Sequence, residues 1–383
     1  MQEKAFAIID QSHEQMLKLW GDLVNIDSGS TYKAGVDAVA DRIEAELKAI
    51  GFKTRQVEAA EAGNTLIAEY GDCSKDFIFF TGHMDTVFNK VGEAEERPFT
   101  IDAQGLAHGP GCLDMKGGDT ILITVMRTLI GLGYNKHGFK IVLAGDEETA
   151  HPYSRAAEII QEEAKGAKCA FNFETGFEDN GIVVTRKGVL SFTIETFGRA
   201  THVGNAPENG RSAVIEMAHH MIDLEALTDL DKGYNITCGV VSGGTVRNST
   251  PDYCKCGCDM RVKSAEQMEE MIAVIEKTLA KQYVPDTTTK MTINAKFLPQ
   301  VIVPGTEELF NFVKDIYEEL GYGTPYMKHV GGGSDSAYTT AAGVPTLCAM
   351  GVQGANNHTL KEYAVVETLY NRAKLMCAIL LRI

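Results

Sequence analysis

The chain has 383 residues, of which 44% are hydrophobic and 23% charged, and its formal net charge is −16. This length is enough for two or three domains with complete hydrophobic cores. The acidic balance argues against surfaces that bind polyanions, so we expect no nucleic-acid partner and no docking on an anionic membrane.

Targeting and membrane segments are not expected. The first residues, MQEKAFAIIDQSHEQ, carry early charges and lack the apolar core of a signal peptide, and no apolar run approaches a membrane-spanning length. The nine cysteines are odd in number and scattered, which favours reduced thiols over a disulfide framework. We therefore expect a cytoplasmic protein.

Helices and strands alternate in the first half of the chain. Apolar spacing predicts helices over residues 3–24, 33–50, 120–132 and 154–165, and strands near 52–58, 65–70, 77–82, 139–144 and 169–173. This alternation predicts an α/β domain with a mixed, largely parallel sheet flanked by helices.

The pattern changes near residue 185. Predicted strands at 189–197, 234–242, 252–262 and 290–298 enclose predicted helices at 210–227 and 264–282. The order β-α-β-β-α-β is that of a ferredoxin-like unit, which can offer an edge strand to another subunit. Helices at 305–321 and 364–381 and a strand near 344–350 then resume the first pattern. We predict a catalytic domain of residues 1–184 and 300–383, interrupted by an inserted ferredoxin-like α+β domain of residues 185–299.

Three cysteines in this insertion, Cys254, Cys256 and Cys258, alternate along one predicted strand. They would share one face but stand about 7 Å apart per step, which is poor geometry for a tetrahedral metal site. We interpret them as structural.

The organising stretch is residues 77–88, FIFFTGHMDTVF. Its apolar run ends at Gly82 and leads directly to His83 and Asp85, at the kind of strand end where open α/β sheets bind ligands. Imidazole is a common metal ligand, and a carboxylate two residues away can fix the orientation of its ring.

Further metal-competent side chains follow other predicted strands or lie in loops. These are Glu147, Glu148, Glu174, Asp114 and His358. Histidine and carboxylate donors without cysteine suit Zn²⁺ or a similar divalent ion. Two ions would need a bridging carboxylate, and a further carboxylate without a metal could act as general base. Taken singly, each residue could instead be a surface, capping or loop residue.

Several segments resemble, in order and spacing, those of the M20 family of metallopeptidases. TGHMDTV, GPGCLDMKGG, AGDEE, FNFETG and HTLKEY resemble the metal-site segments of that family. RKGVLSFTIETFGRATHVGNAPENG and GGTVRNSTPDYCKCGCDMR resemble its dimerisation domain, and GGGSDSAY resembles its substrate-side loop. The resemblance spans residues 77–372 and is greatest to the glutamate carboxypeptidase (carboxypeptidase G2-like) branch.

The resemblance implies two Zn²⁺ ions per subunit, with Co²⁺ or Mn²⁺ as substitutes. Asp114 would bridge the two ions. His83 and Glu174 would complete one site, and Glu148 and His358 the other.

The resemblance also implies catalytic and substrate-binding roles. Asp85 would orient His83, and Glu147 would be the general base that activates water and protonates the leaving amine. His202 would act in the active site of the partner subunit of a homodimer, on the scissile carbonyl or the oxyanion. The substrate carboxylate would be bound by Asn248, Arg261, Gly332 and Gly333.

Glu174 occupies a position where carboxypeptidase and deacylase members of the family tend to have Glu and aminopeptidases Asp. We therefore expect cleavage of the amide bond of a small peptide or N-acyl amino acid with a free C-terminal carboxylate. Residues 149–153 (TAHPY) and 297–299 (FLP) depart from the family pattern, which usually has a small turn and an Arg-Pro pair there.

Three alternatives remain open. The first is an aminoacylase, deacetylase or di/tripeptidase of the same family. The second is a non-catalytic metal-dependent binding protein, which would not need the unligated Glu147. The third is a phosphate-binding enzyme using GGGSDS, which lacks the lysine and spacing of a phosphate-binding loop.

Overall fold

The computed structural model describes residues 1–383, and the chain forms two compact units. The first comprises Met1–Thr185, Gln300–Val330 and Ser334–Ile383, and the second Arg186–Pro299 and Gly331–Gly333. The predicted boundaries assign Gly331–Gly333 to the catalytic domain, whereas this turn groups with the second compact unit. Side chains of the second unit hold this turn: Arg261 Nη1 donates to Gly331 O (3.0 Å) and Arg186 Nη1 to Gly333 O (3.0 Å).

The first unit is built on a six-stranded sheet in the order β1-β2-β6-β3-β7-β15. The strands are β1 Lys53–Val57, β2 Thr65–Tyr70, β3 Ile78–His83, β6 Phe139–Ala144, β7 Cys169–Asn172 and β15 Thr346–Leu347. Strands β6, β3, β7 and β15 are parallel, whereas β2 is antiparallel to β6 and β1 to β2. The predicted mixed, largely parallel sheet is confirmed. Every residue of the central strand β3 is buried, as its apolar run predicts.

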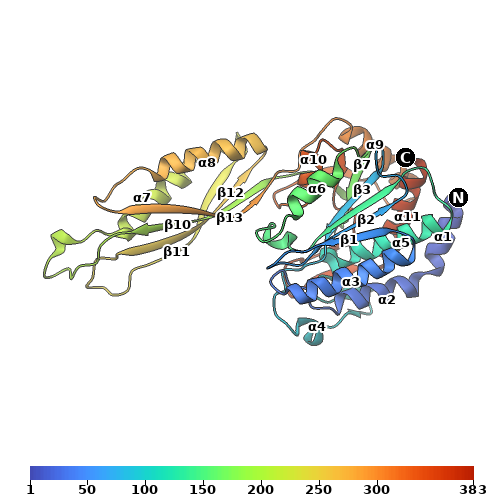
Figure 1. Ribbon diagram of the computed structural model, residues 1–383, viewed down its shortest axis with the longest axis horizontal. Helices are drawn as coiled ribbons and strands as arrows, with labels where there is room; N and C mark the ends of the chain where they lie inside the picture. Colours follow the sequence, from blue (N-terminus) through green and yellow to red (C-terminus); the bar gives the residue numbers. More distant parts are fainter. The chain divides into compact units, whose positions relative to one another are not determined.

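Helices cover both faces of this sheet (Figure 1). Helices α3, α5 and α11 lie on one face with α1 and α2 beside them, and α6 and α10 lie on the other. The helices of this unit are α1 Gln2–Gln11, α2 His13–Val24, α3 Lys33–Ala49, α4 Glu93–Glu96, α5 Gly117–Gly131, α6 Ala156–Ala164, α9 Thr306–Glu319, α10 Ser336–Ala341 and α11 Val366–Arg382. The single helix predicted over residues 3–24 is two helices. Ser12 Oγ and N both bond to Ile9 O, and this local bonding interrupts the helix.

Two smaller sheets complete the first unit. One has the order β4-β5-β17-β16-β8 and the other pairs β14 with β9. Their strands are β4 Thr100–Ile101, β5 Leu106–His108, β8 Gly176–Phe177, β9 Gly181–Arg186, β14 Tyr326–Val330, β16 Gln353–Ala355 and β17 Tyr363–Val365. The sequence analysis predicts none of them. Five of the seven are only two or three residues long, which is too short for a periodic pattern, and β9 and β14 lie in stretches that it leaves unassigned.

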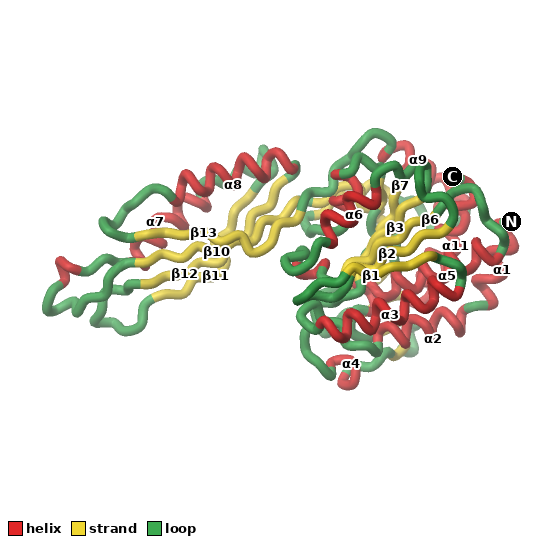
Figure 2. The backbone as a smooth tube through the Cα atoms, in the orientation of Figure 1, coloured by secondary structure: helices red, strands yellow, loops and turns green.

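The second unit has the predicted order β-α-β-β-α-β. Its elements are β10 Gly188–Phe197, α7 Ala213–Glu225, β11 Asn235–Gly243, β12 Tyr253–Val262, α8 Ala265–Leu279 and β13 Thr288–Phe297. They form an antiparallel sheet in the ferredoxin-like order β11-β12-β10-β13 (Figure 2). Apolar side chains from the sheet, α7 and α8 form a core separate from that of the first unit.

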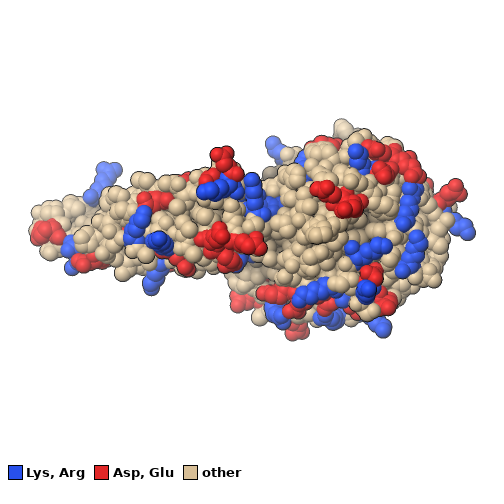
Figure 3. All heavy atoms as spheres, turned by 90° about the horizontal axis from the view of Figure 1, so that it is seen from above, with Lys and Arg blue, Asp and Glu red and all other residues tan.

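The surface carries both signs of charge. On the face drawn in Figure 3, lysine and arginine side chains lie among aspartate and glutamate side chains over both units. None of the helices combines the length and the hydropathy that crossing a membrane requires.

Candidate metal centre

The predicted metal ligands of the first unit gather at the carboxyl ends of three adjacent parallel strands. His83 is the last residue of β3, Glu147 and Glu148 follow β6, and Glu174 follows β7. Because parallel neighbours end at the same edge of a sheet, these side chains converge. The other two predicted ligands arrive from loops.

The donor atoms form two groups that share one carboxylate. His83, Asp114 and Glu174 form the first group, and Asp114, Glu148 and His358 the second; in each, the ligand atoms lie within 4.8 Å of one another. Asp114 Oδ1 is 3.2 Å from His83 Nε2, whereas Asp114 Oδ2 is 3.1 Å from His358 Nε2. The two oxygens of Asp114 therefore face different groups, as a bridging ligand requires.

Glu147 stands beside both groups without belonging to either. Its Oε2 is 4.0 Å from His83 Nε2, and its side chain is buried. Burial raises the pKa of Glu147 well above its usual value, and burial raises that of Glu148 to about 7. The carboxylates thus share a poorly hydrated space in which negative charge is unfavourable.

The charge balance fits a bound cation. Burial alone would raise the pKa of Asp114, but hydrogen bonds with His358 and His83 hold it well below its usual value. The same bond to Asp114 raises the pKa of His358 to about 11. Glu148 Oε1 is buried without a hydrogen-bond partner. Nitrogen and oxygen donors in this number suit Zn²⁺ or a similar divalent ion, whose charge would replace the protons.

Asp85 contacts more than the histidine that it is predicted to orient. His83 Nδ1 is 3.0 Å from the Asp85 backbone oxygen and 3.5 Å from Asp85 Oδ1. The carboxylate also accepts hydrogen bonds from Glu147 N (3.1 Å), Glu148 N (3.2 Å) and Ser30 Oγ (2.6 Å). Asp85 therefore ties the turn that carries both glutamates to the end of β3.

Glu362 is a supporting residue that the sequence analysis missed. Its carboxylate accepts hydrogen bonds from the backbone N–H groups of Gly111 (3.1 Å), Leu113 (2.9 Å) and Asp114 (3.0 Å), and so fixes the Asp114 loop. Asn357 Nδ2 donates to Asp114 Oδ2 (3.0 Å). Glu362 lies in the HTLKEY segment, so its proximity to His358 in the sequence was the available signal.

The unusual residues 149–153 place a buried histidine beside the glutamates. His151 Nδ1 is 3.0 Å from Asp146 Oδ1, and His151 Nε2 is 2.6 Å from Asp335 Oδ1. Burial alone would lower the pKa of His151, but Asp335 and Asp146 raise it well above its usual value. The histidine thereby links the turn after β6 to the loop that precedes α10.

Two predicted residues, His202 and Asn248, lie together in the second unit. Val203 N donates to Asn248 O (3.1 Å), and His202 forms an isolated β-bridge with Ser249. Both His202 and Asn248 are exposed. They stand beyond the end of the sheet at which Phe197 pairs with Tyr253.

Arg261, Gly332 and Gly333 lie at the other end of the same sheet. Arg261 Nε and Nη2 bind the two carboxylate oxygens of Asp259 at 2.7 and 3.0 Å. The Arg261 guanidinium group, which is expected to bind a substrate carboxylate, is therefore paired with Asp259 in this structure. Tyr253 and Arg261 stand about 27 Å apart at the usual rise per residue of a strand. Within one unit, His202 and Asn248 are thus far from Arg261.

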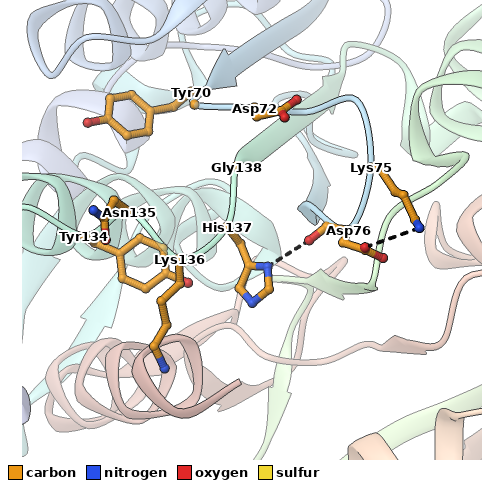
Figure 4. Close-up of a pocket in the computed structure, with 10 residues that line it drawn as sticks. Tyr70, Asp72, Lys75, Asp76, Tyr134, Asn135, Lys136, His137 and Gly138 are labelled. Atoms are coloured by element: carbon orange, nitrogen blue, oxygen red, sulfur yellow. Dashed lines mark hydrogen bonds and ion pairs between the residues drawn. The ribbon is translucent and has the colours of Figure 1, made fainter.

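A pocket of about 470 Å³ in the first unit lies at the opposite edge of the main sheet (Figure 4). It is lined by residues that precede β3 and β6, including Lys75, Asp76, Lys136 and His137. His137 Nδ1 bonds to Asp76 O (2.9 Å), and Lys75 pairs with Asp76 (3.8 Å). None of the predicted site residues lines it, so it is separate from the donor groups.

Comparisons with known proteins identify the family of the chain. The model of peptidase family M20/M25/M40 matches residues 79–382. The chain is 27% identical to carboxypeptidase G2 of Pseudomonas sp. over 94% of this chain and 88% of that protein. It is 26% identical to a succinyl-diaminopimelate desuccinylase of Bradyrhizobium sp. over 95% of this chain and 98% of that protein.

Solved structures share the fold. The aminopeptidase PepT of Bacillus cereus superposes with a TM-score of 0.78 at 23% identity, covering 96% of this chain and 98% of that one. An M20 family metallo-carboxypeptidase of Sulfolobus solfataricus superposes with a TM-score of 0.75 at 14% identity, covering 95% and 98%.

The family match defines the class of the protein as a metal-dependent hydrolase. The chain belongs to peptidase family M20/M25/M40, whose model matches most of its length. It is a metallohydrolase of the peptidase and aminoacylase type, as its curated relatives are.

Proposed function

We propose that the protein is a cytoplasmic, homodimeric hydrolase with two Zn²⁺ ions per subunit. It cleaves the amide bond of a small peptide or N-acyl amino acid that has a free C-terminal carboxylate. The observation that carries this proposal is the shared Asp114, each of whose oxygens faces a different donor group.

The residues fit two adjacent ions. Asp114 would bridge them, with His83 and Glu174 completing one site and Glu148 and His358 the other. When bound, such ions polarise the scissile carbonyl and increase the acidity of a water molecule.

Glu147 would carry out the proton transfers. It is buried beside the donor groups and is not needed as a ligand, so it can accept the proton of the attacking water and later give it to the leaving nitrogen. Asp85 holds the backbone of Glu147 and Glu148 in place. The retained Glu147 also counts against a protein that only binds a metal.

The substrate class rests on the relatives and on Glu174. The names carboxypeptidase and succinyl-diaminopimelate desuccinylase point to peptides and N-acyl amino acids. In the resemblance described above, Glu at position 174 favours carboxypeptidases and deacylases over aminopeptidases. Because one relative is a desuccinylase, an aminoacylase-type activity is the second candidate function.

The homodimer is supported by the second unit. His202 and Asn248 lie so far from Arg261 that the three residues of one unit cannot all contact the same small substrate. A second copy of the chain would therefore contribute His202 and Asn248. The edge strand β11 and helix α7 also expose apolar side chains: Ile215, Ile222, Val240 and Val241. An unpaired edge beside apolar side chains suits a symmetric contact between two copies.

The test is hydrolysis of a panel of N-acyl amino acids and dipeptides by the Zn²⁺-loaded protein. The panel includes C-terminal Glu, Asp, Gly and Leu, each with a free and an amidated carboxyl group, with the Glu147→Gln variant as control. We expect turnover that requires the free carboxylate and vanishes in the variant. Turnover of amidated peptides with a free N-terminus would instead indicate an aminopeptidase. No turnover of any substrate, with two ions bound per chain, would contradict the proposed activity.

A further inference from the structure

Three thiols converge in the second unit, outside the candidate metal centre. Cys256 Sγ is 3.7 Å from Cys258 Sγ, and Cys258 Sγ is 3.7 Å from Cys238 Sγ. The three sulfur atoms all lie within 4.8 Å of one another. Cys256 and Cys258 are buried, and Cys238 is partly exposed.

Neighbouring strands create this group. Cys256 and Cys258 lie on the buried face of β12, whose residues alternate strictly between buried and more exposed positions. Cys238 lies directly opposite Cys258 on the edge strand β11, and the pairing shifts register immediately after Cys238. The expected separation of about 7 Å between successive cysteines of this strand is wrong for the sulfur atoms of Cys256 and Cys258, which lie 3.7 Å apart. Strand β11 supplies the third donor, Cys238. Cys254, two residues before Cys256, lies outside the group.

The distances between the sulfur atoms match those between the ligands of a tetrahedral metal–thiolate site. Sulfur atoms bound tetrahedrally to one ion at about 2.3 Å lie about 3.8 Å apart. Both Sγ–Sγ separations of 3.7 Å are close to this value, so little movement is needed to place an ion between the sulfurs.

We propose that Cys238, Cys256 and Cys258 form a third metal site, which binds a soft, thiophilic ion. Binding releases the protons of the coordinating thiols to the solvent. Thiolates select Cu(I) and Zn²⁺ among common ions. The same core contains thioether side chains, including Met217, Met260 and Met271, and three sulfur donors without a fourth protein ligand favour Cu(I).

The test titrates the full, reduced chain under anaerobic conditions. One arm uses Cu(I) in competition with a chromophoric chelator. The other uses Cd²⁺ as a spectroscopically visible substitute for Zn²⁺. Ultraviolet thiolate-to-metal absorption distinguishes this site from the candidate metal centre, which contains no sulfur donor. We expect one thiolate-bound ion per chain, with the tighter binding in the Cu(I) arm.

Two variants and one control assign the site. Cys256→Ser and Cys238→Ser should lose the absorption and weaken binding by more than about 100-fold. Cys254→Ser, on the same face of the same strand, should bind as the wild type does. Because Cys238 is partly exposed, Cys238→Ser remains informative if a buried variant fails to fold. Absence of thiolate absorption in both arms, or equal absorption in all three variants, would overturn the proposal.

Discussion

The two donor clusters of this protein are built in opposite ways. The nitrogen and oxygen cluster of the first unit combines residues that are far apart in the sequence: His83, Asp114, Glu148, Glu174 and His358. The sulfur cluster of the second unit uses two adjacent strands and only cysteine. Parallel strands collect distant residues at one edge of a sheet, whereas an antiparallel pair brings side chains face to face.

This difference gives the clusters different support. Asp85 and Glu362 hold the backbone of the first cluster through five hydrogen bonds to N–H groups. The sulfur cluster depends on the sheet itself and on the pairing of Cys238 with Cys258. Substitutions at supporting residues should therefore weaken the first cluster without altering the second.

The largest effect is expected at the two neighbouring glutamates. Glu147→Gln and Glu148→Gln should each lower kcat/KM by about 10³-fold or more, because one removes the general base and the other a ligand. Metal content should distinguish them: Glu147→Gln retains both ions, and Glu148→Gln loses one. Loss of metal in Glu147→Gln would contradict its assignment as an unligated base.

The next effect concerns His202. Its substitution by Ala should lower kcat by about 10²- to 10³-fold, the usual effect of removing an oxyanion donor. Mixing inactive His202→Ala and Glu147→Ala chains should restore activity in heterodimers, since one active site then has both residues. Subunit exchange confirmed without any recovery of activity would exclude action in trans.

A smaller effect is expected at Asp85. Asp85→Asn keeps the shape of the side chain but weakens its bonds to the backbone of Glu147 and Glu148. We expect about 10- to 100-fold loss of metal affinity or activity, as for other residues that support ligands. The Cu(I) affinity of the cysteine site is the internal control and should not change.

The last effects concern stability rather than activity, at two buried histidines with opposite pH behaviour. Asp335 and Asp146 outweigh burial and raise the pKa of His151, so its contribution to stability is complete below about pH 6.5 and is lost as pH rises through the folded-state pKa. Burial lowers the pKa of His220 despite the nearby Glu216, so its contribution is present above about pH 6.5 and is lost as pH falls.

Chemical denaturation measured across a range of pH tests the predicted direction of the pH dependence for both histidines. His151→Gln should lower the free energy of unfolding by about 3–5 kcal/mol at pH 6, where the buried charge pairs are intact, and by less at higher pH. His220→Gln should remove the loss of stability at acidic pH. If the free energies of unfolding of the two variants changed with pH in the same way, the opposite pKa shifts assigned to His151 and His220 would be contradicted.

Part of the candidate metal centre was predictable, because His83, Glu148 and Glu174 lie at or after the ends of apolar strands and Asp114 lies in a glycine-rich loop. Each of these signals is weak alone, and the set was assigned through the resemblance to a family. Although Glu362 lies near His358 in the sequence, its contacts with the Asp114 loop were not predictable, because they join segments about 250 residues apart. A sequence pattern gives the period of each element but not the contacts between distant loops.

The cysteine cluster illustrates the same limit. The alternation of Cys254, Cys256 and Cys258 predicted their common face correctly, as the burial of β12 confirms. Cys238 could be recruited only once the register of β11 against β12 was known. Register depends on the whole sheet and on the irregularity after Cys238, which a single sequence does not reveal.

The most direct test of the account is the number of Zn²⁺ ions bound per chain, measured by elemental analysis in a Cys238→Ser background that removes the proposed sulfur site. We expect two ions in this background, one after the further change Glu174→Gln, and none held tightly after Asp114→Asn. Asp114→Asn that still holds both ions would contradict the central claim that Asp114 bridges a two-metal centre.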